Sequence, residues 1–250
     1  MRYYITSIFF ILLVYASYLL LDGCVLWLVW IGLSLFYIGL LVYGSIEIAS
    51  QFYVRTVCRK KQANGCVAIT FDDGPESENT PEILALLKQY EAKASFFVVG
   101  KQCEAYPEML KRTADAGHLI GNHSYSHSYF FPLFSVSKIR KELTKTQEII
   151  KQSIGEEPLF FRPPFGVTNP LIYRALFPFH FTVVGWSIRT FDTVRTKEQV
   201  LHKIQSKVQD GAVILLHSTT KDILWILKNT LELLEEKSLK VVRIDELINR

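Results

Sequence analysis

Cysteine is scarce in this chain, which has four cysteines among 250 residues. No two of them have the spacing of a paired metal-ligand motif; they are Cys24, Cys58, Cys66 and Cys103. The chain also lacks internal repeats and low-complexity tracts. The sequence therefore gives no indication of a disulfide framework or of a repeat architecture. Cysteine usage leaves the cellular compartment open.

An excess of charge of one sign is also missing from most of the chain. Five of the 28 basic and two of the 24 acidic residues precede Asn64, so 23 basic and 22 acidic residues remain in 64–250. Nucleic-acid-binding domains carry a basic face, so we expect no nucleic-acid partner. The one local basic cluster, Arg55–Lys61, could contact anionic lipid headgroups or form a solvated linker.

Charge is absent altogether from two long apolar runs near the N-terminus. Ile5–Leu21 lies between Arg2 and Asp22, and Cys24–Tyr43 lies between Asp22 and Glu47. Each run is about as long as a helix that crosses a hydrocarbon core of ~30 Å. Asp22 and the glycine after it are typical of a tight turn. We therefore predict a transmembrane helical hairpin that contacts membrane lipid.

Two alternatives compete with the hairpin. A cleaved signal peptide has a shorter apolar core followed by polar chain, whereas here a second apolar run follows. The run Leu21-Asp22-Gly23-Cys24 loosely resembles a lipoprotein cleavage box, in which Asp fits poorly.

We divide the chain into a membrane anchor with a basic linker, 1–63, and a catalytic domain, 64–250.

Positive charge flanks both ends of the predicted hairpin, with Arg2 before it and Arg55–Lys61 after it. The positive-inside tendency then places both ends, and the domain that follows, in the cytoplasm. At the N-terminus this bias depends on one arginine and the terminal amine. The face of the membrane that holds the catalytic domain therefore stays open.

Beyond Asn64, short apolar runs alternate with amphipathic stretches. The predicted strands are Cys66–Phe71, Ala94–Val99, Leu119–Gly121, Leu159–Phe161, His180–Val184, Ala212–Leu216 and Lys240–Ile244. The predicted helices begin at Thr80, cover Glu104–Ala116 and Ser137–Ile154, and begin again near Pro170, Thr196 and Thr220. Strands that alternate with helices indicate an α/β fold with a mainly parallel sheet or a barrel.

Polar residues gather where the predicted strands end. They are Asp72 and Asp73, then His123 and His127, then Arg162 to Gly166, then Trp186 to Asp192, and finally His217. If all strands run parallel, these loops share one face of the sheet, as the catalytic loops of (β/α) barrels do. An Asp-Asp-Gly-Pro segment alone is most often a turn. Because these residues are expected on one face, together they are stronger evidence for a functional site than any one of them.

The residue types in this set suit a metal-dependent hydrolase. Histidines four positions apart fall on one side of a helical turn, so His123 and His127 could reach one ion. Two imidazoles and one carboxylate leave open positions for water and substrate, as in catalytic zinc sites. A second carboxylate could accept a proton from water, and another histidine could protonate a leaving group. The combination favours hydrolysis of an amide or an ester.

These residues resemble the motifs of the polysaccharide deacetylase family, carbohydrate esterase family 4, across about residues 64–250. The segments that carry the resemblance are Thr70-Phe71-Asp72-Asp73-Gly74-Pro75, His123-Ser124-Tyr125-Ser126-His127, Arg162-Pro163-Pro164-Phe165-Gly166 and Leu215-Leu216-His217. The resemblance implies a distorted, incomplete (β/α) barrel. It also implies a divalent metal, with zinc the usual ion and cobalt or nickel as alternatives.

The resemblance further assigns roles to individual residues. Asp72 would be the catalytic base, oriented by Arg162, and His217 the general acid, tuned by Asp192. The implied metal ligands are Asp73, His123 and His127. The backbone N–H near Phe165 would help to stabilise the oxyanion. Substrate contacts would come from Phe165, Pro164, Trp186 and Leu215.

One motif departs from the family pattern. The family often has an acid where this chain has Arg189, and a tryptophan where it has Thr193. Asp192 is kept, so the departure affects the expected sugar subsites more than the chemistry.

The aromatic segment Tyr129–Phe134 is interpreted as loop packing, with a lipid-facing or sugar-stacking surface as the alternative.

The implied activity is removal of N-acetyl groups from N-acetylhexosamine units of a cell-envelope glycan. An outward-facing domain would act on peptidoglycan or another polymer, and an inward-facing one on a lipid-linked amino sugar or other precursor. The alternative is a catalytically weak or inactive relative that binds carbohydrate.

Overall fold

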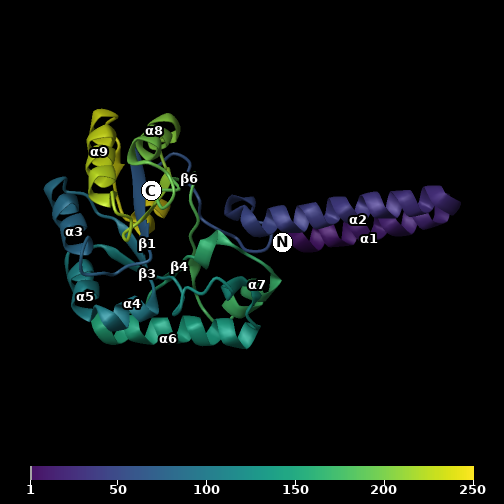
Figure 1. The fold of residues 1–250 in the computed structure, drawn as a ribbon, viewed down its shortest axis with the longest axis horizontal. Coiled ribbons are helices and arrows are strands. Elements are labelled where there is room, and N and C mark those ends of the chain that lie inside the picture. The colour runs from purple at the N-terminus through teal and green to yellow at the C-terminus, as the bar shows by residue number, and fades with distance from the viewer. Residues whose placement is uncertain (1) are drawn as a thin grey trace.

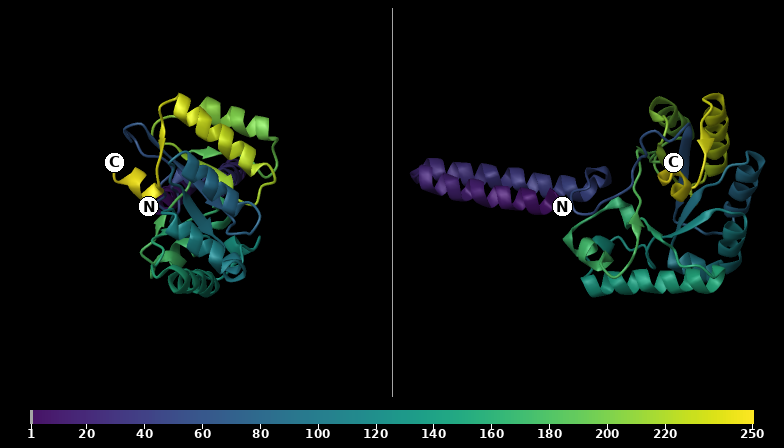
Figure 2. Two further views of the ribbon diagram at one scale, coloured as in Figure 1. Left: turned by 90° about the vertical axis from the view of Figure 1, so that its left-hand side faces the viewer. Right: turned by 180° about the vertical axis from the view of Figure 1, so that it is seen from behind.

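The computed structural model describes residues 2–250. Two long helices, α1 (Arg2–Leu20) and α2 (Gly23–Ile46), lie antiparallel and project from an α/β body, as Figures 1 and 2 show. Asp22 is the N-cap of α2, and Gly23 has φ of +52°, a left-handed conformation that glycine adopts without strain. The chain therefore reverses direction at the predicted turn.

The sheet of the body has the strand order β5-β4-β3-β2-β1-β7-β6, with β8 paired to the start of β1. All strand pairs are parallel, and β5 and β6 at the two ends do not pair with each other in the described chain. The strands are β1 (Cys66–Asp72), β2 (Ser95–Val98), β3 (Leu119–Asn122), β4 (Phe160–Phe161), β5 (Thr182–Val183), β6 (Ile188–Arg189), β7 (Val213–His217) and β8 (Lys240–Val241). The sheet curls without closing, so the predicted distorted, incomplete (β/α) barrel is confirmed.

Helices lie around the outside of this sheet, with α6 along the bottom and α8 and α9 at the top of Figure 1. The helices of the body are α3 (Thr80–Gln89), α4 (Gly100–Ala105), α5 (Pro107–Asp115), α6 (Val136–Ile154), α7 (Pro170–Leu176), α8 (Lys197–Lys207), α9 (Ile223–Glu236) and α10 (Ile244–Ile248). Three 3-10 turns accompany them, η1 (Ile48–Ser50), η2 (Phe131–Leu133) and η3 (Pro164–Gly166). Because crossover helices cover its outer face, the parallel sheet keeps its strands buried.

Local capping explains several of these boundaries. Thr196 and Gln199 form a capping box at the start of α8, and Gly155 ends α6 with φ of +79°. Thr80 is not the cap of its helix, because α3 already includes it and Asn79 precedes it as the N-cap.

Two predictions of secondary structure were wrong. The single helix predicted over Glu104–Ala116 is two helices, α4 and α5, because Pro107 has no N–H to continue the first one. The sequence pattern also missed β6, which has only two residues. Such a short strand shows no periodicity.

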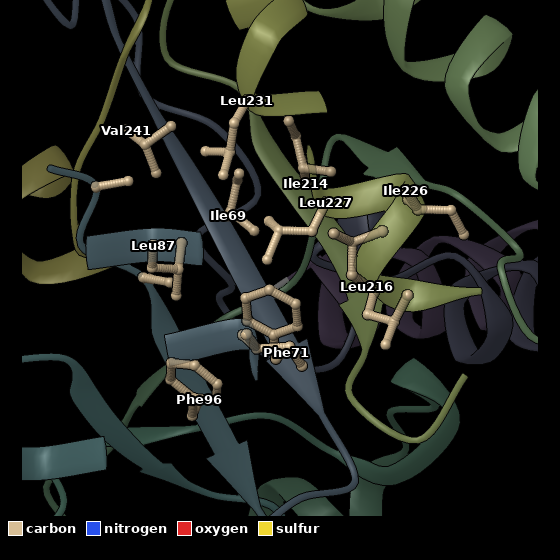
Figure 3. Close-up of a cluster of buried hydrophobic side chains, with 14 of the residues drawn as sticks. Ile69, Phe71, Leu87, Phe96, Ile214, Leu216, Ile226, Leu227, Leu231 and Val241 are labelled. Atoms are coloured by element: carbon tan, nitrogen blue, oxygen red, sulfur yellow. The ribbon is translucent and has the colours of Figure 1, made fainter. Parts of the chain in front are cut away.

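The main core lies between the outer face of β1 and β7 and the helices α3 and α9. Figure 3 shows Ile69 and Phe71 of β1 among Leu216 of β7, Leu87 of α3 and Leu231 of α9, all of them buried. Burying a side chain of this size contributes roughly 1.5–3 kcal/mol. This core fixes β1 and β7, whose carboxyl ends carry Asp72 and His217.

The segment after α2 belongs to the body of the protein. Ile48, Phe52, Tyr53 and Val54 are buried there. The backbone N–H of Val57 donates to Val183 O at 2.8 Å, next to the end strand β5. The backbone and the apolar side chains of this stretch are therefore packed against the sheet.

The same segment fixes the base of the helical hairpin. Tyr3 N–H donates to Phe52 O at 3.2 Å, and Thr168 N–H donates to Ser45 O at 3.0 Å. A side chain at Gly44 would overlap the ring of Phe52, so glycine permits this close contact. The hairpin and the body are thus joined by backbone hydrogen bonds as well as by apolar packing.

Both long helices are apolar on nearly every face and almost wholly exposed, with Ser17 and Gly44 their buried residues. Polar groups between them pair internally, since Trp30 Nε1 donates to Ser17 Oγ at 3.0 Å. By length and composition each helix could cross a membrane, and a signal sequence near an N-terminus shares these features.

Candidate active site

Two consecutive acids stand at the carboxyl end of β1. Asp72 is the last residue of this fully buried strand and is 3% exposed. Asp73 follows with φ of +74°, a left-handed conformation that aspartate tolerates better than most residues. Both acids line one cleft of about 320 Å³ at this end of the sheet. That volume is at the lower end of the range of ligand pockets.

Two histidines face these acids from the loop after β3. His127 Nε2 lies 3.4 Å from Asp73 Oδ1, and His123 Nε2 lies 3.7 Å from the same oxygen. The helical turn predicted for these residues is wrong. They lie in a loop in which Ser124 and His127 have positive φ, and this loop brings the two rings to 4.8 Å between centroids.

The loop is held by an acid that the sequence analysis missed. Glu142 Oε2 on α6 accepts hydrogen bonds from Tyr125 N–H at 3.2 Å and from Ser126 N–H at 2.7 Å. The hydroxyl of Ser126 donates to the same oxygen at 2.8 Å. Glu142 thus positions the histidine loop from a distant point in the sequence.

Asp73, His123 and His127 fit a divalent metal ion. One ligand atom from each lies within 4.8 Å of the other two. Asp73 Oδ1 is buried and has no hydrogen-bond partner among the described residues, which is costly unless a cation compensates it. His123 Nδ1 donates to Arg162 O at 2.7 Å, which fixes the ring with Nε2 toward Asp73.

The electrostatics of His127 agree with this fit. Burial, together with the neighbouring His123, lowers the pKa of His127 to about 4. The imidazole is therefore neutral near pH 7, and a neutral imidazole is the form that binds metals. Two imidazoles and a carboxylate are a donor set typical of zinc, and imidazole also suits cobalt and nickel.

Asp72 is held apart from this ligand set by Arg162. The Nη1 group of Arg162 donates to Asp72 Oδ1 at 2.7 Å and to Thr70 Oγ1 at 2.9 Å. Arg162 is 0% exposed, and its other nitrogens donate to Val184 O and Gly185 O. The guanidinium is thereby locked, so one oxygen of Asp72 is fixed while the other, Oδ2, lies 3.7 Å from His123 Nε2.

The charge state of Asp72 follows from these neighbours. Burial by itself would raise the pKa of this carboxyl, but Arg162, His123 and His217 together outweigh burial and lower it. Asp72 is therefore ionised at neutral pH. A buried carboxylate with one unshared oxygen is able to accept a proton.

His217 stands at the end of β7, next to Asp72 in the register of β1 and β7, and its side chain pairs with Asp192. Its Nδ1 donates to Asp192 Oδ1 at 2.8 Å, and its backbone N–H donates to Asp192 Oδ2 at 2.7 Å. Burial would lower the pKa of His217, but the hydrogen bond and charge of Asp192, with Asp72 and Asp73 beyond, raise it to about 9. The protonated ring has Nε2 free to donate a proton.

Aromatic and apolar side chains form the walls of the cleft. Phe165, with φ of +60°, stacks on Tyr129 at 5.5 Å between centroids, and both line the cleft. A side chain at Gly166 would overlap Trp186, so the loop can pass this ring only with glycine. Trp186 and Leu215 also line the cleft and pack on Ile48, which follows the hairpin in the chain.

The structure thus brings most of the predicted site residues to one cleft, namely Asp72, Asp73, His123, His127, Phe165, Trp186, Leu215 and His217. Arg162 and Asp192 lie behind Asp72 and His217, and Pro164 is buried in the loop before Phe165. Thr70, Arg189 and Phe191 lie in predicted site segments without a predicted role, and Glu142 lies outside these segments. Thr70 belongs to the first motif, but no sequence signal points to Glu142.

The fold and the cleft are those of the polysaccharide deacetylase family. The sequence model of the family described as polysaccharide deacetylase matches residues 59–184, and the chain belongs to this family. A peptidoglycan-N-acetylglucosamine deacetylase of Bacillus cereus is 40% identical over 156 residues, which cover 61% of this chain and 56% of the relative. The peptidoglycan-N-acetylmuramic acid deacetylase PdaC of Bacillus subtilis is 36% identical over 60% of this chain and 32% of its own length. The matches thus span about half of the first relative and a third of the second.

Solved structures agree with this assignment. A carbohydrate esterase family 4 pseudoenzyme from Bacillus anthracis superposes with a TM-score of 0.72 at 27% identity, over 78% of this chain and 69% of that one. A mutant of it with restored enzymatic activity gives the same TM-score at 29% identity. The fold therefore accommodates both active and inactive members.

Proposed function

We propose that this protein is a metal-dependent deacetylase that removes N-acetyl groups from N-acetylhexosamine units of a cell-envelope glycan or glycan precursor. The observation that carries the proposal is a single cleft lined by an ionised Asp72, by a protonated His217 that pairs with it in the register of β1 and β7, and by the Asp73–His123–His127 set. Amide hydrolysis needs a base for water and an acid for the amine, and this cleft offers both.

Asp73, His123 and His127 would hold the metal. A divalent ion bound there, zinc before cobalt or nickel, would polarise the acetamido carbonyl and lower the pKa of a water molecule. Asp72 is not needed as a ligand, because its Oδ1 is already taken by Arg162. This division of the two adjacent acids into a base and a ligand is the central claim of the proposal.

The chain's own groups then move two protons. Asp72 Oδ2 accepts a proton from the water that attacks the carbonyl carbon, while Arg162 keeps the carboxylate ionised and in place. The backbone N–H of Phe165 would donate to the developing oxyanion. His217 Nε2 gives its proton to the amide nitrogen as the C–N bond breaks, and Asp192 stabilises the imidazolium until then. The products are acetate and an amino sugar.

The walls of the cleft would bind the sugar. Phe165 with Tyr129, and Trp186 with Leu215, offer apolar faces against which a pyranose ring can pack. Tyr129 was interpreted from the sequence as loop packing, but it lines the cleft. This favours the sugar-stacking alternative for that one residue.

We further propose that α1 and α2 anchor the enzyme in a membrane and that residues 64–250 form its catalytic domain. Exposed apolar side chains on nearly every face of both helices support the anchor, since such helices are stable in hydrocarbon. Arg2, whose guanidinium donates to Ser50 O at the base of the hairpin, would lie at headgroup level. A membrane-linked substrate and a wall polymer are both within reach of a domain held at the base of the hairpin.

The alternative function is carbohydrate binding without turnover. A pseudoenzyme among the structurally similar proteins supports this alternative. Retention of every proposed ligand, base and acid in this cleft speaks against it.

Acetate release decides between the two functions. The full chain in neutral detergent should release acetate from N-acetylglucosamine tetramers, peptidoglycan fragments or a lipid-linked N-acetylated sugar, and a chelator should abolish the release. Binding of all three without acetate release would establish the non-catalytic alternative.

A further inference from the structure

Arg189 lies in the wall of the cleft, on the end strand β6. It pairs in parallel register with Leu215 of β7, and residues paired across neighbouring strands project to the same face of the sheet. Both residues line the cleft that contains Asp72 and His217. The cleft therefore presents a guanidinium close to the reacting groups.

The guanidinium of Arg189 is held by aromatic rings. Its Cζ lies 5.4 Å from the ring centroid of Trp186 and 4.7 Å from that of Phe191. Stacking of this kind positions the planar group while leaving the N–H donors at its edge unused. Within residues 2–250, these donors form no hydrogen bond, and no carboxylate lies within 4.0 Å of them.

Arg189 differs in this respect from the other charged groups around the cleft. Arg162 is paired with Asp72, and His217 is paired with Asp192. Asp73 is the carboxylate of the candidate metal set. Among the described residues that line the cleft, Arg189 is thus the cation without an acidic side chain to compensate its charge.

Two more cations gather around the same aromatic ring. Lys203 Nζ lies 4.4 Å and Arg195 Cζ 5.1 Å from the ring centroid of Phe191. In the part of the chain that the structure describes, neither has an ion-pair partner. Partial burial and the nearby Arg195, Lys207 and Arg189 lower the pKa of Lys203, which reflects this crowding of like charges.

We propose that Arg189, with Arg195 and Lys203 behind it, forms a subsite for an anionic group of the glycan, a carboxylate or a phosphate, next to the acetamido group that is cleaved. A guanidinium edge matches both anions with two parallel hydrogen bonds. The crowded cations repel one another, so a bound anion is stabilised by all three. The subsite rests on the proposed function, because the cleft must hold an N-acetylated sugar for its neighbour to reach Arg189.

The two sources of such an anion are chemically distinct. One is the lactyl carboxylate of an N-acetylmuramic acid unit, and the other is a phosphate ester on the glycan or on its lipid carrier. Four ligands separate them. The first pair is a peptidoglycan tetrasaccharide with free carboxylates and the same tetrasaccharide as its methyl ester. The second pair is an N-acetylglucosamine tetramer bearing one phosphate monoester and the unmodified tetramer.

The test measures the preference of the full chain for each anionic ligand over its uncharged counterpart, by kcat/KM for acetate release and by calorimetric Kd. In the wild type, one anionic ligand should be preferred, and which one identifies the source. Arg189→Gln should reduce that preference about 10-fold to 100-fold, as expected for loss of a charged hydrogen-bond pair. Arg189→Lys should restore part of it, and higher salt should weaken it.

Lys207→Gln provides the matched control, because it removes one positive charge from the same region but does not line the cleft. It should leave the preference within about twofold, since a screened surface charge acts weakly. Equal preference for charged and uncharged ligands in the wild type, or an equal effect of the Arg189 and Lys207 variants, would overturn the subsite. Failure of the proposed function would show differently, as calorimetric preference for the anion without acetate release from any ligand.

Discussion

The Nη1 group of Arg162 lies 2.7 Å from Oδ1 of Asp72, and both side chains are almost completely buried. This ion pair joins the end of β1 to the loop after β4, which lies three strands away in the sheet. It leaves Oδ2 of Asp72 as the oxygen directed to the histidines. The base of the proposed reaction is thus both ionised and oriented by one buried arginine.

Arg162→Met should raise the pKa of Asp72, because burial without a cation favours the neutral carboxyl. The acid limb of the profile of kcat/KM against pH should then move to higher pH. A buried carboxylate without its partner should also cost about 3–5 kcal/mol of stability at neutral pH. Arg112→Met, at an exposed position on α5, is the control and should change neither quantity measurably.

The pH dependence of stability gives a second readout of the same pair. The folded-state pKa of Asp72 is depressed, so its carboxylate stabilises the wild type above the unfolded pKa of about 3.9 and less as pH falls through the folded pKa. The deficit of Arg162→Met, measured by thermal unfolding in detergent, should therefore shrink in acid. A deficit independent of pH would contradict the ion-pair account.

Asp192→Asn should lower the pKa of His217 from about 9, because it removes the carboxylate charge that outweighs burial. The general acid would then lose its proton at lower pH, and the alkaline limb of the pH–rate profile should move in the same direction. Thr220→Val removes one hydrogen bond to Asp192, of 3.2 Å, but keeps the charge, so it should shift this limb much less. Coincident alkaline limbs in wild type and Asp192→Asn would exclude His217 as the group tuned by Asp192.

Ile48→Ala should destabilise the protein by about 2–5 kcal/mol, as expected for truncating a buried isoleucine. The cavity would lie against Trp186 and Leu215, so the KM for the glycan should rise as well. Leu159→Ala, at a residue that is 60% exposed, is the size-matched control. If Ile48→Ala left both the melting temperature and KM unchanged, the segment after the hairpin would have no part in the cleft wall.

Two reporters fused after Arg250 show on which side of the membrane the α/β body lies. One reporter is active only in the cytoplasm and the other only outside it. Arg2 and Arg55–Lys61 at both ends of the hairpin predict activity of the cytoplasmic reporter. That result would assign the enzyme to a lipid-linked or soluble precursor. Activity of the outer reporter would contradict the positive-inside expectation and assign it to wall glycan.

The location of the acids could be predicted from the sequence because a short apolar run precedes them. Val67-Ala68-Ile69 has the pattern of a buried strand, and sites in parallel α/β folds form at the carboxyl ends of strands. The conformation of the histidine loop could not be predicted in this way. Its positive φ values at Ser124 and His127 depend on Glu142, which reaches the loop only once α6 has packed on the body.

Contacts between distant segments account for the remaining differences. Ile48 follows an apolar helix and carries no motif, so its place against Trp186 depends on how residues 47–60 pack along the sheet. Arg189 stood out in the sequence only as a departure from a pattern. Its stacking between two rings and its lack of an acidic partner are properties of the folded cleft.

The division of roles between the two adjacent acids is tested most directly by metal content and acetate release, measured together on wild type, Asp72→Asn and His123→Ala. Asp72→Asn should keep as much zinc as the wild type but lose acetate release by about 10²-fold or more, since only the base is removed. His123→Ala should lose the metal and the activity together. Equal loss of zinc in the two variants, or acetate release by Asp72→Asn at the wild-type rate, would contradict the assignment of Asp72 as base and Asp73 as ligand.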